Sequence, residues 1–369
     1  NPGGAVVNGV YEDCAFVSNR VERITDGGAC WFSNPTGAVR RCMFFDNMVV
    51  TNGYGGAIYA KTSIPVTDSA FTNNYAWSCG GAVLKGFCTN CTFTGNMAVY
   101  RGGALSEGEA VDCVFRDNRK YDRVNGTKST HYEYGGGCAY KSNLIRCDFT
   151  DGAFWKCSLT DCSIHDVVNG IAPCVFYEEN WTTNCLESGC SGLGNGLFYR
   201  YLYRPSNDDH RGAVRSSMVN CTLADNTVAT AGTFGFNGAH KTNDFDFVNC
   251  IFHNNKVKSG AVADLSGALA PGVTFQNCLY GVSDGTLPWE DKGGNIVCAD
   301  PKFAKNFQNG RYPYYMPKPN SPAVNAGLAA DWMSTATDLY GTNRVLNAKV
   351  DIGCYESIIP FIGAAIIFR

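Results

Sequence analysis

The stretch GGAVLKGFCTNCTFTGN (Gly80–Asn96) decides the fold of this 369-residue chain. It begins with paired glycines, and its second half follows the pattern C-x-F-x-x-N. The same pattern recurs as CAFVSN, CMFFDN, CVFRDN and CIFHNN, which begin at Cys14, Cys42, Cys113 and Cys250. SAFTNN and CTLADN are near-copies, and many successive copies lie 22 to 34 residues apart. Such a period predicts a solenoid of stacked rungs.

The physical chemistry of the unit agrees with this prediction. Cys91 and Phe93 are two residues apart, so on a strand both point to the same face. We expect Asn96 to adopt the left-handed conformation of a sharp corner. The pair Gly80-Gly81 supplies another corner where no Cβ fits. Because a single rung cannot bury its own inner face, it must stack on the next.

The repeat therefore predicts ladders of like residues in a parallel β-helix. The cysteine and asparagine ladders comprise Cys14, Cys42, Cys91, Cys113, Cys221, Cys250, Asn19, Asn47, Asn74, Asn96, Asn118, Asn226 and Asn255. Stacked cysteines lie about one strand spacing apart, which is wider than a relaxed disulfide prefers, so buried thiols are expected. Cysteines off the ladder are expected to bridge instead: Cys30, Cys79, Cys88, Cys138 and Cys190.

Composition narrows the class of protein. The chain is 45% hydrophobic and 17% charged with a net charge of −3, so no basic surface points to nucleic acid or to an anionic membrane. Nineteen cysteines favour an oxidising, extracytoplasmic location. Cys88 with Cys91 and Cys185 with Cys190 lack the partner pairs of a zinc site, so no metal site is predicted.

The alternation of GGA[VIL] with F-x-x-N over about residues 1–280 resembles the passenger repeats of chlamydial polymorphic outer-membrane proteins, which are surface adhesins. NSPAVNAG (Asn320–Gly327) and VDIGCYE (Val350–Glu356) resemble the closing segment of secreted pectate-lyase-like β-helix proteins. The resemblance implies an all-β, right-handed parallel β-helix with loop excursions. We expect one domain over 1–356, with repeat rungs in 1–280, closing rungs in 281–356 and an apolar tail in 357–369.

Three segments break the repeat and are expected to be loops: 119–134, 191–215 and 281–294. The middle one holds Asp208, Asp209, His210 and Arg211, which could supply an acid, a base and a charge clamp for polysaccharide cleavage. Their Pro-Ser-Asn context is also typical of a solvated turn.

The same segment carries an aromatic and arginine run: Phe198, Tyr199, Arg200, Tyr201, Tyr203 and Arg204. Such residues suit sugar stacking or protein docking, although a core strand with one wet face is the favoured alternative. His165 and His240 stand alone and are expected to be satisfied polar residues. Asp338, Arg344, Asp351 and Glu356 are expected to form an ion-paired clasp for the last rung.

The ends of the rod are candidates for self-association, because raw strand edges need caps. The predicted contact residues are Gly3, Gly4, Ile358, Ile359, Phe361, Ile362, Ile366, Ile367 and Phe368. The tail could cover its own helix, add to the first rung of another copy in a head-to-tail filament, or serve sorting or anchoring.

Two functions remain open from the sequence. The first is a non-catalytic, adhesin-like extracellular surface or structural protein, whose partners are other copies of itself, a surface glycan or a host protein. The second is a polysaccharide lyase or glycoside hydrolase of the pectate-lyase-like kind. No cofactor is expected for the first, whereas the resemblance allows calcium for the second. No nucleic-acid partner and no transmembrane segment are predicted.

Overall fold

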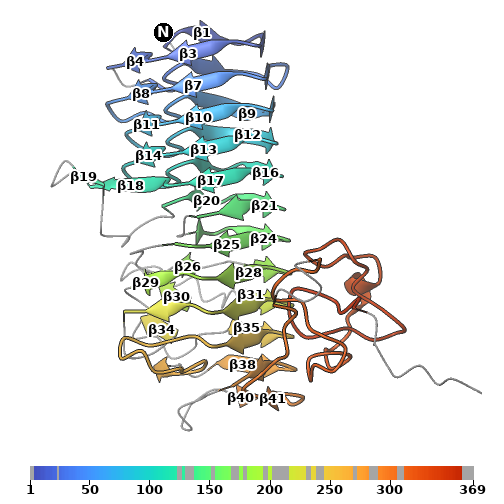
Figure 1. Cartoon of the computed structure of the whole chain (residues 1–369). Helices are drawn as coiled ribbons and strands as arrows, with labels where there is room; N and C mark the ends of the chain where they lie inside the picture. The colour runs from blue at the N-terminus through green and yellow to red at the C-terminus, as the bar shows by residue number, and fades with distance from the viewer. Residues whose placement is uncertain are drawn as a thin grey trace, which may run out of the picture.

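The structure is a computed structural model that describes residues 4–22, 25–122, 127–128, 137–150, 154–167, 174–177, 181–193, 198–201, 216–229, 234–237, 245–268, 272–281, 290–305 and 311–359. The described chain winds into a right-handed parallel β-helix whose rungs stack from the N-terminus downward (Figure 1). The all-β, parallel β-helix prediction is confirmed.

Sheet A contains two strands from most rungs, and these make two faces. Face A1 contains β1 (Val6–Val7), β5 (Cys30–Phe32), the first part of β9 (Ile58–Thr67) and of β12 (Val83–Thr89), β15 (Leu105–Ser106), β20 (Ala139–Tyr140), β23 (Phe154–Trp155), β26 (Cys174–Tyr177), β30 (Phe198–Tyr201), β34 (Phe234–Asn237) and β37 (Gly267–Ala268). Face A2 contains β2 (Val10–Glu12), β6 (Ala38–Arg40), the second parts of β9 and β12, β16 (Glu109–Val111), β21 (Asn143–Ile145), β24 (Ser158–Thr160), β27 (Trp181–Thr183), β31 (Ser216–Val219), β35 (Phe245–Val248), β38 (Val273–Gln276) and β40 (Glu290–Asp291).

Three further sheets complete the described rungs. Sheet B contains β3 (Ala15–Val17), β7 (Met43–Phe45), β10 (Ala70–Thr72), β13 (Thr92–Thr94), β17 (Val114–Arg116), β22 (Asp148–Phe149), β25 (Ser163–His165), β28 (Leu186–Ser188), β32 (Thr222–Ala224), β36 (Ile251–His253), β39 (Leu279–Tyr280) and β41 (Ile296–Val297). Sheet C contains β4 (Arg20–Val21), β8 (Met48–Val49), β11 (Tyr75–Ala76), β14 (Met97–Ala98), β18 (Arg119–Asp122) and β19 (Thr127–Lys128). β29 (Ser191–Leu193) pairs with β33 (Thr227–Val228), and one 3₁₀ helix, η1, covers Asp331–Ser334.

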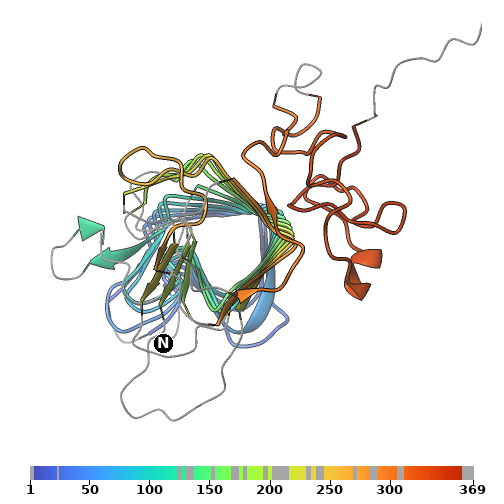
Figure 2. The same cartoon turned by 90° about the horizontal axis from the view of Figure 1, so that it is seen from below.

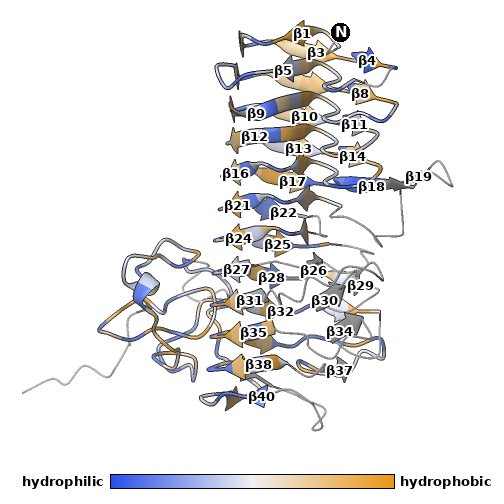
Figure 3. Cartoon of the chain, turned by 180° about the vertical axis from the view of Figure 1, so that it is seen from behind, coloured by the Kyte–Doolittle hydropathy of each residue, from blue (hydrophilic) through white to orange (hydrophobic). Residues whose placement is uncertain are grey.

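The core is built from in-register columns, as the repeat predicts. Along sheet B the rings of Phe16, Phe44, Phe71, Phe93, Phe115 and Phe149 stack. Neighbouring ring centroids in this column lie 4.7–5.0 Å apart. Apolar residues accordingly follow the strands of successive rungs (Figure 3). This column fixes the register of sheet B.

The asparagine ladder lies at the next corner and is almost fully hydrogen-bonded. Asn74 is fully buried, and both its backbone N–H and its Nδ2 donate to Asn96 Oδ1, at 3.0 and 2.9 Å. Its Nδ2 also donates to the carbonyl oxygen of Phe44, and its Oδ1 accepts from the backbone N–H and Nδ2 of Asn47. The same pattern joins Asn226 to Asn255. Each amide thus replaces backbone pairing where the chain turns.

The left-handed residue at this corner is one position earlier than the sequence predicts. Positive φ angles occur at Asp46 (53°), Asn73 (55°) and Gly95 (66°), each directly before a ladder asparagine. The expectation that the ladder asparagines themselves are left-handed is therefore wrong. Their amides are needed inside the corner, and the residue before each of them supplies the turn.

Paired glycines form the other corner for two separate reasons. Gly80 has φ = +67°, a conformation that side chains with a Cβ rarely adopt. A Cβ on Gly81 would lie 1.9 Å from the carbonyl oxygen of Gly103 in the next rung. The first glycine permits the turn, and the second permits close stacking.

The ladder cysteines carry free, mostly buried thiols, as predicted. They also hydrogen-bond: the Cys113 thiol donates to the Val111 carbonyl oxygen, and Cys113 Sγ accepts from the Cys91 N–H at 3.4 Å. The predicted bridging of the off-ladder cysteines is wrong, because Cys30, Cys79, Cys88 and Cys190 are also free and Cys138 lies buried in the core. Their strand neighbours are not cysteines; Cys88, for example, pairs in register with Val66 and Ala110.

We expect Cys113→Ser to preserve stability better than Cys113→Ala. Ser69 occupies the equivalent position, where its hydroxyl donates to Thr67 and accepts from the Cys42 N–H. Alanine would leave the buried N–H of Cys91 without its acceptor, at a cost of about 1 kcal/mol or more. Urea unfolding of the two variants tests this, and equal midpoints would show that the thiol only fills space.

All three predicted loops contain strands of the solenoid. Phe198–Tyr201 forms β30, which pairs with β26 and β34, and Glu290–Asp291 forms β40. In the third, Arg119–Asp122 forms β18 and pairs with β14. Within these segments, 123–126, 129–134, 194–197, 202–215 and 282–289 lie outside the described residues.

The closing segment, residues 298–359, lies beside the rod and is not a set of further rungs (Figures 1 and 2). It packs on the outer face of the lower strands of sheet B. Leu186 contacts a cluster with Met316 and Tyr355, and Ile251 contacts one with Phe303 and Ile352. The reason is that these lower strands carry apolar side chains outward as well as inward. The prediction of closing rungs in this segment is therefore wrong beyond β41.

Candidate functional site

The residues predicted for catalysis, Asp208, Asp209, His210 and Arg211, lie outside the described residues, as do Tyr203 and Arg204. The aromatic run upstream falls on strand β30. In register, Arg200 aligns through Phe176 with Phe154, whose ring is fully buried, and Tyr201 aligns through Tyr177 with Trp155. Phe198 and Tyr199 pair with Cys174 and Val175. This run is therefore part of a rung.

Strand pairing places Tyr201 in a register column of face A1 that we name the aromatic strip. Its members in register are Val7, Trp31, Tyr59, Leu84, Ser106, Tyr140, Trp155, Tyr177, Tyr201 and Asn237. Near the top of the rod, the rings of Trp31 and Tyr59 are half-exposed and stack at 6.2 Å with planes 11° apart. Tyr54, 40% exposed, lies 6.5 Å from Tyr59.

Lower on the strip, an arginine covers two rings. The Arg101 guanidinium lies 4.8 Å from the ring centre of Tyr140 and 4.6 Å from that of Trp155, and it donates to the Tyr140 hydroxyl at 2.8 Å. This cation–π arrangement leaves both rings largely buried. The strip thus has an open upper part and an arginine-covered lower part.

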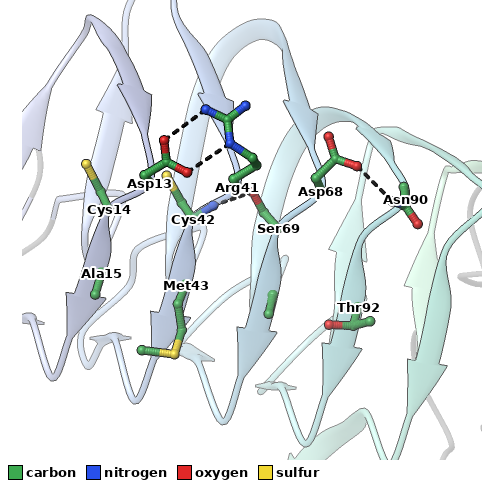
Figure 4. Close-up of a pocket in the computed structure, with 11 residues that line it drawn as sticks. Asp13, Cys14, Ala15, Arg41, Cys42, Met43, Asp68, Ser69, Asn90 and Thr92 are labelled. Carbon is green, nitrogen blue, oxygen red and sulfur yellow. Dashed lines mark hydrogen bonds and ion pairs between the residues drawn. The ribbon is translucent and has the colours of Figure 1, made fainter.

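A shallow hollow of about 500 Å³ lies where sheet B meets face A2 (Figure 4). Left-handed residues form a polar row along it, and they pair across rungs. Arg41 binds Asp13 through two nitrogens at 2.8 and 2.9 Å, and Asn90 donates to Asp68 at 2.7 Å. The Arg41 guanidinium lowers the pKa of Asp13. Because these polar side chains pair with one another, we interpret the row as structural support for the corner.

A histidine clamped by two carboxylates lies on the outer face of sheet B. His165 Nε2 is 2.7 Å from Asp148 Oδ1, and His165 Nδ1 is 2.9 Å from Asp166 Oδ2. Arg116 reaches the other oxygen of Asp148 at 3.4 Å. The two carboxylates outweigh the opposing effect of burial and raise the pKa of His165. His165 is therefore satisfied, as predicted, but within a cluster that can hold or move a proton.

The predicted clasp is present in the closing segment. Arg344 is fully buried and pairs with Glu356 at 3.2 Å. Asp338 accepts the backbone N–H groups of Tyr340, Thr342 and Glu356, and Asp351 accepts those of Asn325 and Ser357. The clasp holds the closing segment together and does not close a last rung.

The clasp should make the closing segment less stable as pH rises. Burial raises the pKa of Glu356 to about 8 and also raises the pKa values of Asp338 and Asp351. An acid with a raised pKa in the folded state binds more protons folded than unfolded. Stability of the closing segment is therefore lost as pH rises from about 4.5, the ordinary pKa of a glutamate, to about 8. Proteolysis of the closing segment should be faster at pH 8.5 than at pH 5.5, and Glu356→Gln should flatten this dependence.

The predicted self-association residues are only partly described. Gly4 packs closely against Gly28 of the next rung: a Cβ on Gly4 would lie only 1.7 Å from the Gly28 carbonyl oxygen. Ile359 is 4% exposed and packs within the closing segment of its own molecule, whereas Ile358 is 38% exposed. Gly3, Phe361, Ile362, Ile366, Ile367 and Phe368 lie outside the described residues.

Sequence reasoning missed the partner of His165 and the column membership of Trp31 and Tyr59. Both depend on register between rungs of unequal length. The sequence does show one departure from the repeat in this region: in CLESGC, Glu187 takes the place of the phenylalanine. In the structure Glu187 is buried, and its strand neighbours in register are Ile164 and Leu223. His165 lies on β25, the strand that pairs with the strand of Glu187, whereas Trp31 and Tyr59 lie in rungs near the N-terminal end of the rod.

Comparison with known proteins places the fold. A solved structure titled "Crystal structure of pectate lyase Pel9A" matches over 97% of this chain and 88% of that chain, with a TM-score of 0.50 and 12% identity. The chain has the fold of a pectate lyase.

A second structure, of QnrB1, a plasmid-mediated fluoroquinolone resistance protein, covers 77% of this chain and 94% of that one at 12% identity, but its TM-score of 0.18 carries no argument. No protein-family model and no curated protein sequence matches the chain. Among the described residues, none of the helices is long and apolar enough to cross a membrane.

Proposed function

We propose that this chain is an extracellular, non-catalytic binding protein of the β-helix class, adhesin-like in its use of a rigid rod to present a surface. The observation that carries the proposal is the aromatic strip. Trp31, Tyr54 and Tyr59 expose ring surface on one face, while the residues flanking Trp31 and Tyr59 on their strands, such as Cys30 and Phe32, are buried in the core. Rings held by the rod lose little conformational entropy on binding.

Both glycans and proteins could bind to such a strip, and a binding experiment distinguishes these two classes of ligand. The purified chain is tested against immobilised polysaccharides and against host-cell surface protein. The double variant Trp31→Ala, Tyr59→Ala should weaken retention about tenfold. Arg41→Ala, on the hollow of sheet B, is the matched control and should bind normally. Equal retention by both variants would contradict the proposal.

End-to-end assembly is a second part of the proposal. In the described residues, β1, β2 and β3 each pair on one side alone, and Val7, Val10 and Val17 are 48–56% exposed beside these edges. Open parallel edges accept further strands. Sedimentation across a hundredfold concentration range tests this. Growing particles support head-to-tail contact, and a constant monomer mass refutes it.

A polysaccharide-cleaving enzyme is the second candidate, favoured by the Asp148–His165–Asp166 cluster with Arg116 nearby. Carboxylates with a raised-pKa histidine can perform acid–base work. If this candidate is correct, a polysaccharide panel with and without calcium will yield shortened products. Asp148→Asn and Asp209→Ala would then separate this cluster from the loop predicted from sequence.

A further inference from the structure

We infer that the outer side of face A2 binds a linear, neutral β-1,4-linked glycan along the rod axis, an inference that rests on the proposed binding function. It is carried by one outward column of face A2. In register, this column runs Phe87, Glu109, Asn143, Ser158, Trp181. It is a different face from the aromatic strip.

The two ends of the column are exposed rings. Phe87 is 50% exposed and Trp181 is 44% exposed. Four rung steps separate them, or about 19 Å at the spacing of strands in a sheet. Ring faces of this kind pack on the C–H faces of pyranose sugars.

Between the rings, three polar side chains form a connected track. Asn143 Nδ2 donates to Glu109 Oε2 at 3.0 Å, and Ser158 Oγ donates to Asn143 Oδ1 at 2.6 Å. All three are half-buried, so they are fixed yet reachable. Their free lone pairs and protons match sugar hydroxyl groups. The adjacent outward column, Thr89, Val111, Ile145, Thr160 and Thr183, adds a flat β-branched floor.

Spacing and charge select the ligand class. An extended β-1,4-linked hexopyranose chain advances by about one rung spacing per sugar, so each sugar meets an equivalent position on the next rung. The charged residue within the column, Glu109, is acidic, and Asp246 lies further along the same register. These carboxylates disfavour a polyuronate and favour a neutral chain.

The experiment is calorimetric titration of the full chain with cellohexaose and chitohexaose. Maltohexaose, which does not extend, and hexagalacturonate, which is anionic, are the comparison ligands. We expect binding of at least one of the first two and weak or no binding of the comparison pair. Phe87→Ala with Trp181→Ala should weaken the binding about tenfold, and Asn143→Leu, which keeps both rings, should weaken it severalfold. Melting curves confirm that each variant is folded.

Other outcomes overturn the inference. Absence of binding by both neutral hexasaccharides does so, as does preference for hexagalacturonate. Binding that is unchanged in the Phe87 and Trp181 variant but lost in Trp31→Ala, Tyr59→Ala also rejects face A2, while it leaves the proposed binding function standing. Shortened oligosaccharides after the titration would instead reject the non-catalytic function itself.

Discussion

Asn74→Leu is expected to lower the free energy of unfolding by at least about 3 kcal/mol, because each orphaned buried polar group costs about 1–3 kcal/mol. Leucine is similar in size, so the loss is one of hydrogen bonds and not of volume. The substitution strands the Phe44 carbonyl oxygen and both donors of Asn47. Urea unfolding followed by circular dichroism measures the change.

Asn19 provides the matched control, since it begins the same ladder but is only half-buried. Asn19→Leu should cost about 1 kcal/mol or less, because water can replace the lost partners. If the two variants unfold at the same urea concentration, the ladder is not the source of stability that the structure indicates.

At pH 8.5, above the raised pKa of Glu356, Arg344→Met should destabilise the closing segment by about 3–5 kcal/mol, the usual result of leaving a buried carboxylate without its ion-pair partner. Arg344 is completely buried, and the carboxylates of Glu356, Asp338 and Asp351 lie in the same clasp. We expect this variant to lose protease resistance between residues 298 and 359 while the rod keeps its β-sheet spectrum.

The exposed ion pair of Arg41 and Asp13 is the control that shows whether the loss of stability in Arg344→Met comes from burial or from ion pairing alone. Its geometry is bidentate, yet its side chains are 50% and 67% exposed. Arg41→Met should therefore cost no more than about 1 kcal/mol. A loss as large as that of Arg344→Met would mean that exposure does not matter here.

The ladders could be predicted from sequence because each rung contributes one residue to each ladder at the same position of the repeat. Phe93 and Asn96 have the same environment as their copies above and below, so a one-dimensional repeat specifies a three-dimensional column. The corner at Gly80-Gly81 was predicted for the same reason.

The remaining features depend on contacts that no repeat records. The closing segment docks through Leu186 and Ile251, whose outward direction follows only from knowing the inward residues beside them. Asp148 meets His165 because a short rung places them on neighbouring strands. The left-handed turns belong to Asn73 and its equivalents because the buried amide of Asn74 is committed to the ladder.

The central claim is that the rod holds a glycan without cutting it, and one measurement tests both halves. Cellulose and chitin are incubated with the chain, the bound fraction is measured by co-sedimentation, and the soluble products are sized by chromatography. We expect the chain to be retained on the polymer, less so in the Trp31→Ala, Tyr59→Ala and Phe87→Ala, Trp181→Ala variants, and we expect no shortened products. Soluble oligosaccharides that disappear in Asp148→Asn, or no retention on either polymer, would contradict it.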